Sequence, residues 1–272
     1  MGVNDISLTS GMRSNLMQLQ GTSKLIDRTQ ERLSTGKQVN SALDNPTNFF
    51  AAQAHVNRAG DFAVRKDGMA EGIQTAKAAD AGISAINSLV EAAKGLASAA
   101  LGTANTVDRG TFSTQYQQLI TQINTLASDS QYRGTNLLTG ATLTVNFNED
   151  ATSKLSVVGF TATATGLSID GTGLNAWTSE GDITLSQAHL GSATNQLRTQ
   201  AKNLANNLNI ITTRQNFTDQ MIGTLQTGAD NLTLADMNQE GANMLMLQTR
   251  QNLGTTALSM SSQAAQSVLR LF

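Results

Sequence analysis

Residues 190–225 read LGSATNQLRTQAKNLANNLNIITTRQNFTDQMIGTL and carry the strongest periodic pattern in the chain. Positions seven residues apart hold Leu190, Leu197, Leu204, Ile211, Thr218 and Leu225, and companion positions hold Ala201, Leu208 and Ile222. A seven-residue repeat of this kind is typical of a helix that packs one narrow seam against another helix. We therefore expect a long helix from about residue 184 to a break marked by Gly228 and residues 231–236.

Both ends of the chain show the same kind of pattern. Helices are expected over about 8–34 and 237–272, each with apolar residues in a seven-residue frame. The seam residues are Met12, Leu16, Leu19, Ile26 and Leu33 in the first helix and Met237, Met244, Leu258, Ala265 and Phe272 in the last. The simplest partner for each terminal helix is the other, so the two ends of the chain should pair.

Two further helices are expected between the connector at 36–48 and the start of the central region at Gly134. Gly36 should end the first helix, and Pro46 can begin the next. That helix should reach about residue 101, although its interior glycines weaken it, and after a loop at 102–110 another helix should return antiparallel to it. The residues expected in the helical core are Ile83, Ile86, Val90, Phe112, Leu119, Ile123, Leu126, Leu190, Leu197, Leu204, Leu208, Ile211 and Ile222.

The region from about 135 to 183 has a different pattern. TLTVNF at 142–147 and KLSVVGF at 154–160 are rich in β-forming residues, and GLSIDGTG at 166–173 is rich in turn-forming ones. We expect a small strand-bearing lobe with Trp177 as a lid over its core. The predicted fold is mainly α: a long antiparallel coiled-coil helical rod with both termini at one end and a small β-containing outer lobe.

The composition favours association with like surfaces over binding of nucleic acid. Charged residues make up 14% of the 272 residues, against roughly 25% in ordinary soluble chains. Polar, weakly charged surfaces can pack against copies of themselves with little ionic desolvation. The net charge of -2 gives no electrostatic reason to expect nucleic acid. Because no apolar run approaches the ~20 residues that span a bilayer, we expect no membrane insertion.

We predict no catalytic, cofactor-binding or metal-binding site, and hence no enzyme. The chain has no cysteine, and its two histidines, His55 and His189, lie far apart in the sequence. Asn146, Asn148 and Asp150 mimic the first three ligands of a calcium loop, but the glycine and the bidentate acid that such a loop needs are missing. We interpret that match as chance.

Several ordered motifs resemble the bacterial flagellin family. They are ERLSTGKQVNSALDN at 31–45, AADAGISAINSLVEAAKGLA at 78–97, DRGTFSTQYQQLITQINTLASDSQYRGTNLL at 108–138, LGSATNQL at 190–197, NLTLADMNQE at 231–240 and SQAAQSVLRLF at 262–272. The resemblance covers nearly all of the chain except about 139–183. The sequence therefore looks like a short flagellin with a minimal central variable region.

The resemblance implies a structural subunit that self-assembles into the helical flagellar filament used for swimming. It implies three parts: an inner terminal coiled coil (1–40 with 232–272), a helical rod domain (41–138 with 184–231) and a small variable outer β lobe (139–183). The implied inner-coil or assembly residues are Met12, Leu16, Leu19, Ile26, Leu33, Met237, Met244, Leu247, Leu258, Ala265, Val268, Leu269, Leu271 and Phe272.

The same resemblance implies the partners and the location. The chain should form a homopolymer, alone or with paralogous flagellins, and should meet the flagellar export apparatus, an export chaperone, and hook-associated and cap proteins. It should be secreted to the extracellular filament without a cleaved signal peptide, since the N-terminus lacks the basic start and apolar run of such a signal. Two alternatives stay open: a hook–filament junction protein of the same family and, more remotely, an enzyme-bearing flagellin-like protein.

One stretch departs from the family. Flagellins that the vertebrate Toll-like receptor detects carry arginine and glutamate in the second helical block, whereas the matching stretch here is VEAAKGLASAA at 90–100, with Ala92, Ala93 and Gly95 in place of charge and bulk. Alanine and glycine cannot replace the donors of an arginine hot spot. We predict weak or absent activation of that receptor. A reporter-cell assay with purified protein tests this, and a strong response would contradict it.

Overall fold

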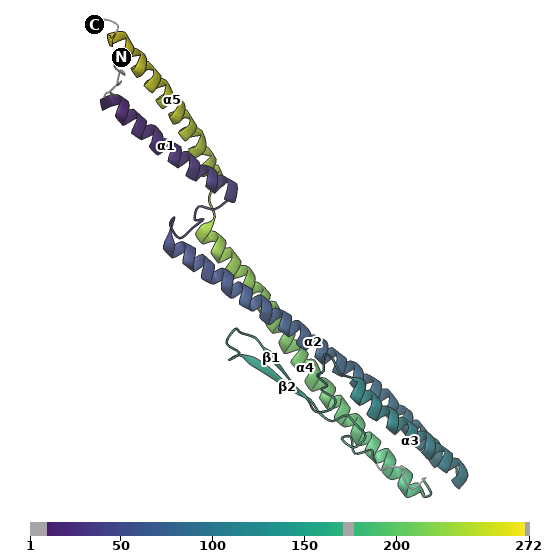
Figure 1. Cartoon of the computed structure of the whole chain (residues 1–272). Coiled ribbons are helices and arrows are strands. Elements are labelled where there is room, and N and C mark those ends of the chain that lie inside the picture. The colour runs from purple at the N-terminus through teal and green to yellow at the C-terminus, as the bar shows by residue number, and fades with distance from the viewer. Residues whose placement is uncertain (1–9, 171–176, 270–272) are drawn as a thin grey trace, which may run out of the picture. The chain divides into compact units, whose positions relative to one another are not determined.

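The computed structural model describes residues 10–170 and 177–269 (Figure 1). This part of the chain is mainly helical, with α1 (Ser10–Thr35), α2 (Pro46–Leu101), α3 (Thr106–Asp129), α4 (Glu180–Thr233) and α5 (Met237–Leu269). One antiparallel hairpin, β1 (Thr142–Asn146) and β2 (Lys154–Val158), lies between α3 and α4 in the sequence. The mainly α class with a small β element is therefore confirmed.

The chain forms two compact units. Unit 1 comprises residues 1–58 and 224–272, and unit 2 comprises residues 59–223. The helices α2 and α4 contribute residues to both units. The three-part division expected from the sequence remains a prediction.

Two helix boundaries differ from those expected. The loop between α2 and α3 is shorter than 102–110, because α3 begins at Thr106. The side chain of Asn105 caps that helix by accepting a hydrogen bond from the backbone N–H of Val107 at 2.9 Å. Gly228 does not end α4, which continues to Thr233 because Ala229 and Thr233 are buried on the same helix. The interior glycines of α2 do not break it, since burial of one face outweighs their low helix propensity.

The core of unit 2 lies between α2, α3 and α4. Most of the sequence-predicted core residues are buried there: Ile83, Ile86, Val90, Ile123, Leu190, Leu197, Leu204 and Ile211. Phe112, Leu119, Leu126 and Leu208 are half-buried and pack against that core, and Ile222 is half-buried. On α3 the buried stripe contains Tyr116, Ile120, Ile123 and Ala127, so Ile120 and Ala127 are more deeply buried than their predicted neighbours Leu119 and Leu126.

The hairpin shares this core. Leu143 faces Val157 across the hairpin and Val145 faces Leu155, so these four side chains lie on one face of it. Val145 and Val157 are buried, and a Cβ added to Gly72 of α2 would lie 2.8 Å from Cγ2 of Val145. The bare backbone at Gly72 therefore lets the hairpin pack closely on α2.

Trp177, three residues before α4 begins, is fully buried. Its ring centroid lies 5.0 Å from that of Tyr116 on α3, and its indole N–H donates to the hydroxyl of Ser186 on α4 at 3.1 Å. Packing and a satisfied donor account for the side chain. The tryptophan therefore belongs to the core that the hairpin shares with α2, α3 and α4.

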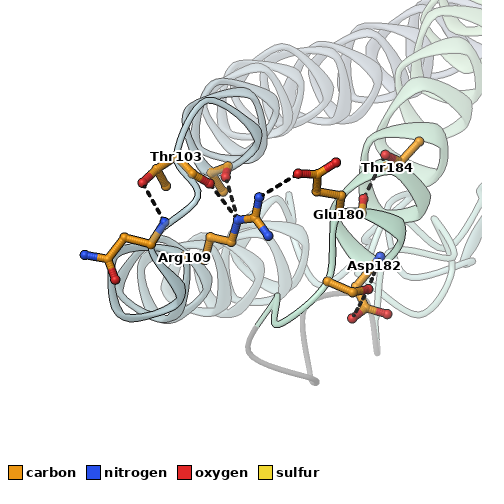
Figure 2. Close-up of polar contacts among 8 residues, drawn as sticks. Thr103, Arg109, Glu180, Asp182 and Thr184 are labelled. Carbon is orange, nitrogen blue, oxygen red and sulfur yellow. Dashed lines mark hydrogen bonds and ion pairs between the residues drawn. The ribbon is translucent and has the colours of Figure 1, made fainter.

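Arg109 joins three chain segments in unit 2, as Figure 2 shows. It is 6% exposed, and its Nε donates to the carbonyl oxygens of Ala100 and Thr103 at 3.2 and 2.8 Å, at the end of α2 and in the loop after it. Its Nη2 lies 3.0 Å from Oε1 of Glu180, the first residue of α4. The guanidinium thus satisfies carbonyl groups that a helix end leaves unpaired. It fixes the turn from α2 to α3 beside the start of α4.

We predict that Gly159→Ala destabilises unit 2. A Cβ there would lie 2.3 Å from the carbonyl oxygen of Ala141 and 2.4 Å from that of Leu137, and backbone atoms cannot move aside cheaply. Forced overpacking of this kind costs about 1–3 kcal/mol. Urea unfolding followed by the fluorescence of Trp177 measures the change.

Gly191→Ala is the matched control, because a Cβ at this position on α4 meets nothing within 4 Å. Alanine in a helix interior is more stable than glycine by about 0.5–1 kcal/mol. The two substitutions should therefore shift the unfolding midpoint in opposite directions. Equal midpoints for both variants would contradict the close approach at Gly159.

Candidate functional site

The candidate site is the pair of terminal helices in unit 1. Figure 1 shows α1 and α5 side by side. Nη1 of Arg32, near the end of α1, lies 2.9 Å from Oε1 of Glu240, near the start of α5. Leu19, earlier on α1, contacts the backbone of Gly254, later on α5. Since residue numbers rise along one helix as they fall along the other, the two helices are antiparallel.

On α1 the buried face alternates apolar and threonine positions. Met12, Thr22 and Thr29 are buried, while Leu19, Ile26 and Leu33 are half-buried. The hydroxyl of Thr22 donates to the carbonyl oxygen of Gln18 at 2.9 Å, so it enters the seam without an unpaired donor. The second row of the seam is therefore made of threonines.

Leu16 does not belong to this seam in the single chain, so the expectation that it lies there was wrong. Its side chain is 37% exposed. Thr22 and Thr29 set the second row, and Leu16 lies one residue round the helix from the matching position, Asn15.

On α5 the most deeply buried seam residues are Glu240 and Leu247, which are 7% and 5% exposed, and with the half-buried Gly254 they lie seven residues apart. The resemblance implied Leu247 as an inner-coil residue, whereas Glu240 and Gly254 were not predicted. A search for apolar repeats passes over this row because it contains a carboxylate and a glycine.

The remaining predicted residues of α5 differ in exposure. Met244, Leu258 and Ala265 are half-buried, whereas Met237 is 46% exposed. The side chains of Val268, Leu269, Leu271 and Phe272 lie outside the described residues. The roles of all these residues in assembly remain predictions.

Two contacts fix the register of the pair. A Cβ on Gly254 would lie 2.7 Å from Cδ2 and 3.1 Å from Cγ of Leu19, so the leucine fills the space that the glycine leaves. The ion pair between Arg32 and Glu240 is well shielded, with side-chain exposures of 21% and 9%. Sliding one helix along the other would separate both pairs and leave the carboxylate shielded without its partner.

Within unit 1, backbone hydrogen bonds tie the connector between α1 and α2 to the residues at the end of α4. Gly36 ends α1 with a φ of +70°, and its carbonyl oxygen accepts from Ala235 N–H at 3.0 Å. The backbone N–H groups of Gln38 and Val39 donate to the carbonyl oxygen of Thr233. These bonds place the end of α1 beside the end of α4.

Asp44 closes the turn within this connector. Its carboxylate accepts the backbone N–H groups of Ser41 and Asn40 at 3.0 and 3.1 Å. The Ser41 hydrogen bond is the main cause that lowers the pKa of Asp44, because it stabilises the charged form. The turn is thus held by an ionised carboxylate at neutral pH.

A second apolar stripe on α5 lies beside the seam and is largely exposed. Met246, Leu253 and Met260 lie seven residues apart and are 52%, 67% and 60% exposed. Leu253 also lines a groove between the two helices, with Leu19, Thr22 and Gly254. On α1, Met17 and Leu25 are exposed as well. We call Met246, Leu253 and Met260 the outer stripe.

Comparison with known proteins identifies the family. Residues 3–142 match the family model for the bacterial flagellin N-terminal helical region, which is half of the chain. The chain belongs to the bacterial flagellin family. This flagellin is 31% identical to flagellin FljM of Caulobacter vibrioides over 278 residues, covering 100% of both chains. It is 28% identical to a flagellin of Brucella melitensis, covering 98% of each.

A crystal structure of Bacillus cereus flagellin is similar over 56% of this chain and 88% of that chain, at 19% identity and a TM-score of 0.48. That score is too low to define the fold, which follows from the helices themselves. The matches over whole chains agree with a short flagellin, because its relatives have nearly the same length.

Flagellins are structural proteins. Within 10–170 and 177–269 no three His, Cys, Asp or Glu side chains come together as a metal site. In the same ranges no helix is long and apolar enough to cross a membrane. Residues 90–100, the stretch that departs from the receptor-detected flagellins, lie on α2, with Ala92 and Gly95 exposed and Ala93 fully buried. The weak receptor response remains a prediction.

We predict that Arg32→Met loosens the pairing of α1 with α5. The substitution leaves the shielded carboxylate of Glu240 without its cation, which should cost about 1–3 kcal/mol of local stability. Hydrogen exchange of the free chain, read on backbone amides of 19–33 and 240–254, measures the loss.

Two variants serve as controls for this effect. The double variant Arg32→Met with Glu240→Gln should recover part of the loss, because no unpaired charge remains. Lys24→Met, an exposed position on α1, should change local stability by less than about 0.5 kcal/mol. Exchange in Arg32→Met as slow as in the unmodified chain would show that the ion pair does not hold the register.

Proposed function

We propose that this flagellin, a structural subunit of the bacterial flagellar filament, polymerises through unit 1. The observation that carries the proposal is the outer stripe, an apolar row that the pairing of α1 with α5 leaves uncovered. The seam between the two helices is already occupied, so it cannot supply all the contacts of a polymer. The outer stripe supplies a further surface on the same pair.

The energetics favour burial of this stripe by another copy. Fully burying a leucine or methionine side chain is worth about 1.5–3 kcal/mol. The three side chains of the stripe are more than half exposed in the single chain, so most of that free energy is still to be gained. The sparse charge of the chain keeps the desolvation cost of like surfaces low.

The symmetry of the contact decides the product. A stripe on α5 that packs against a different surface of the next copy is a heterologous contact, which repeats without closing unless its rotation makes a ring. A helical filament is the open outcome, and a hook–filament junction ring is the closed one. Full-length similarity to several proteins named flagellins supports the open outcome.

We further propose that the filament can contain more than one flagellin. Caulobacter vibrioides flagellins FljM, FljK, FljO and FljN each match this whole chain at 29–31% identity. Paralogues that match this chain over their whole lengths can occupy equivalent positions in one polymer. Contacts with the export apparatus, an export chaperone, and the hook-associated and cap proteins, and export without a cleaved signal, belong to the same proposal.

We predict that removing residues 262–272 abolishes polymerisation while unit 2 stays folded. The truncation removes the half-buried seam residue Ala265 and the last turns of α5, so the terminal pair loses part of its length. Seeded growth scored by electron microscopy gives the result, and Trp177 fluorescence reports the fold of unit 2. Filaments that grow as before would refute the terminal pair as the assembly element, and rings would favour the junction reading.

A point variant tests the role of the outer stripe in polymerisation without shortening the chain. Leu253→Ser removes an outer-stripe side chain that is 67% exposed, so the fold should be kept. Loss of about 1.5–3 kcal/mol of burial in the polymer should raise the critical concentration for growth by about tenfold or more. Leu185→Ser, at a leucine of unit 2 that is 58% exposed on α4, is the control and should leave the critical concentration unchanged.

A further inference from the structure

The sulfur atoms of the chain are distributed unevenly between the two units. The sequence contains nine methionines and no cysteine. In the described part of unit 2, Met69 is fully buried and Met221 is half-buried. In unit 1, four methionines are well exposed: Met17 at 73%, Met237 at 46%, Met246 at 52% and Met260 at 60%. Among the methionines of residues 10–170 and 177–269, the exposed thioethers therefore lie on α1 and α5.

We propose that these four methionines are modification sites, and that their oxidation to methionine sulfoxide in the free subunit prevents polymerisation. The inference rests on the proposed function, because it takes the exposed faces of α1 and α5 as assembly surfaces. The oxidant is hydrogen peroxide. Incorporation into the polymer covers the same sulfur atoms and protects them.

The chemistry is a two-electron oxygen transfer. The thioether sulfur attacks one oxygen of hydrogen peroxide, the O–O bond breaks, and an S–O bond forms. The sulfur is oxidised by two electrons, and the other peroxide oxygen leaves as water after taking the proton of the transferred oxygen. One peroxide is consumed for each sulfoxide, and a methionine sulfoxide reductase reverses the change.

No other side chain in the described residues competes strongly for the oxidant. A thiolate would react by the same route, but the chain has no cysteine. Trp177 and Tyr116 are fully buried. The reaction is therefore directed to the exposed thioethers by access alone.

The consequence for assembly follows from the polarity of the product. A sulfoxide replaces a flexible apolar side chain with a polar one that accepts hydrogen bonds, which disrupts apolar interfaces rich in methionine. Met246 and Met260 flank Leu253 in the outer stripe, so two of its three members change. The seam is less affected, because Met12 is buried and Met244 is half-buried.

The test treats purified, full-length free subunits with hydrogen peroxide, removes the peroxide, and maps sulfoxides by peptide mass spectrometry. Seeded polymerisation is then measured by sedimentation. We expect sulfoxides at Met17, Met237, Met246 and Met260 before Met69, and loss of sedimented polymer. Treatment with both epimer-specific methionine sulfoxide reductases should restore polymerisation. Normal growth of subunits whose four methionines are shown to be oxidised would overturn the proposal.

Two variants assign the effect to these positions. A chain with Met17→Leu, Met237→Leu, Met246→Leu and Met260→Leu keeps the apolar volume and should polymerise equally well before and after peroxide. Met221→Leu, in unit 2, retains the four exposed methionines and should remain sensitive. Sensitivity of the fourfold variant equal to that of the unmodified chain would also overturn the proposal.

A second measurement does not depend on any variant. Filaments grown from unmodified subunits are exposed to the same peroxide, and the oxidation rate of each methionine is compared with that in free subunits. Slower oxidation of the four methionines in the filament supports the proposal, and equal rates refute it. If untreated subunits do not polymerise at all, the proposed function is refuted. If untreated subunits polymerise and oxidised subunits polymerise equally well, only the oxidation proposal is refuted.

Discussion

The pairing of α1 with α5 is the contact on which the rest of unit 1 depends. Each helix has too narrow an apolar seam to be stable alone, and the two seams cover one another only in antiparallel register. Leu19 against Gly254 and Arg32 against Glu240 set that register at two separate points along the pair. The steric contact favours one alignment, and the shielded carboxylate makes other alignments costly. The backbone hydrogen bonds around Gly36 then hold the end of α1 beside the end of α4.

Unit 2 is packed differently, because its core is formed by three helices and the hairpin. The helix α2 contributes small side chains to the core, since Ala93, Ala97 and Ala100 are fully buried, and Val145 and Val157 of the hairpin belong to the same core. Glycines allow close approach at specific points, as at Gly72 beneath Val145 and at Gly159 beside two carbonyl oxygens. Polar groups at the helix ends are satisfied by side chains, with Arg109 serving α2 and Asn105 serving α3. The buried residues of the hairpin, Val145 and Val157, therefore share one core with the helices.

The exposed surface of unit 1 links assembly to chemical reactivity. The same property that makes methionine a good contact residue, a flexible and polarizable thioether, also makes it oxidisable when solvent reaches it. Leucines in the same positions would bury similar area without that sensitivity. With two methionines in its outer stripe, the proposed assembly surface would couple polymer growth to the redox state of its surroundings.

The sequence by itself determined the helices, the family and the location of the hairpin, because seven-residue spacing, β-forming runs and long ordered motifs are local signals. It placed Met12, Leu19, Ile26 and Leu33 in one frame, and the structure buries that face of α1 at least partly. It could not find Thr22, Thr29, Glu240 or Gly254, because polar and small residues on a seam carry no apolar signal until their partners are known. It also placed Leu16 on the seam, and of the two break signals after α4 only the segment 231–236 marks the end of the helix, because burial of Ala229 and Thr233 carries α4 past Gly228. Only the tertiary structure decided register and exposure, since both depend on which side chains from distant parts of the chain meet.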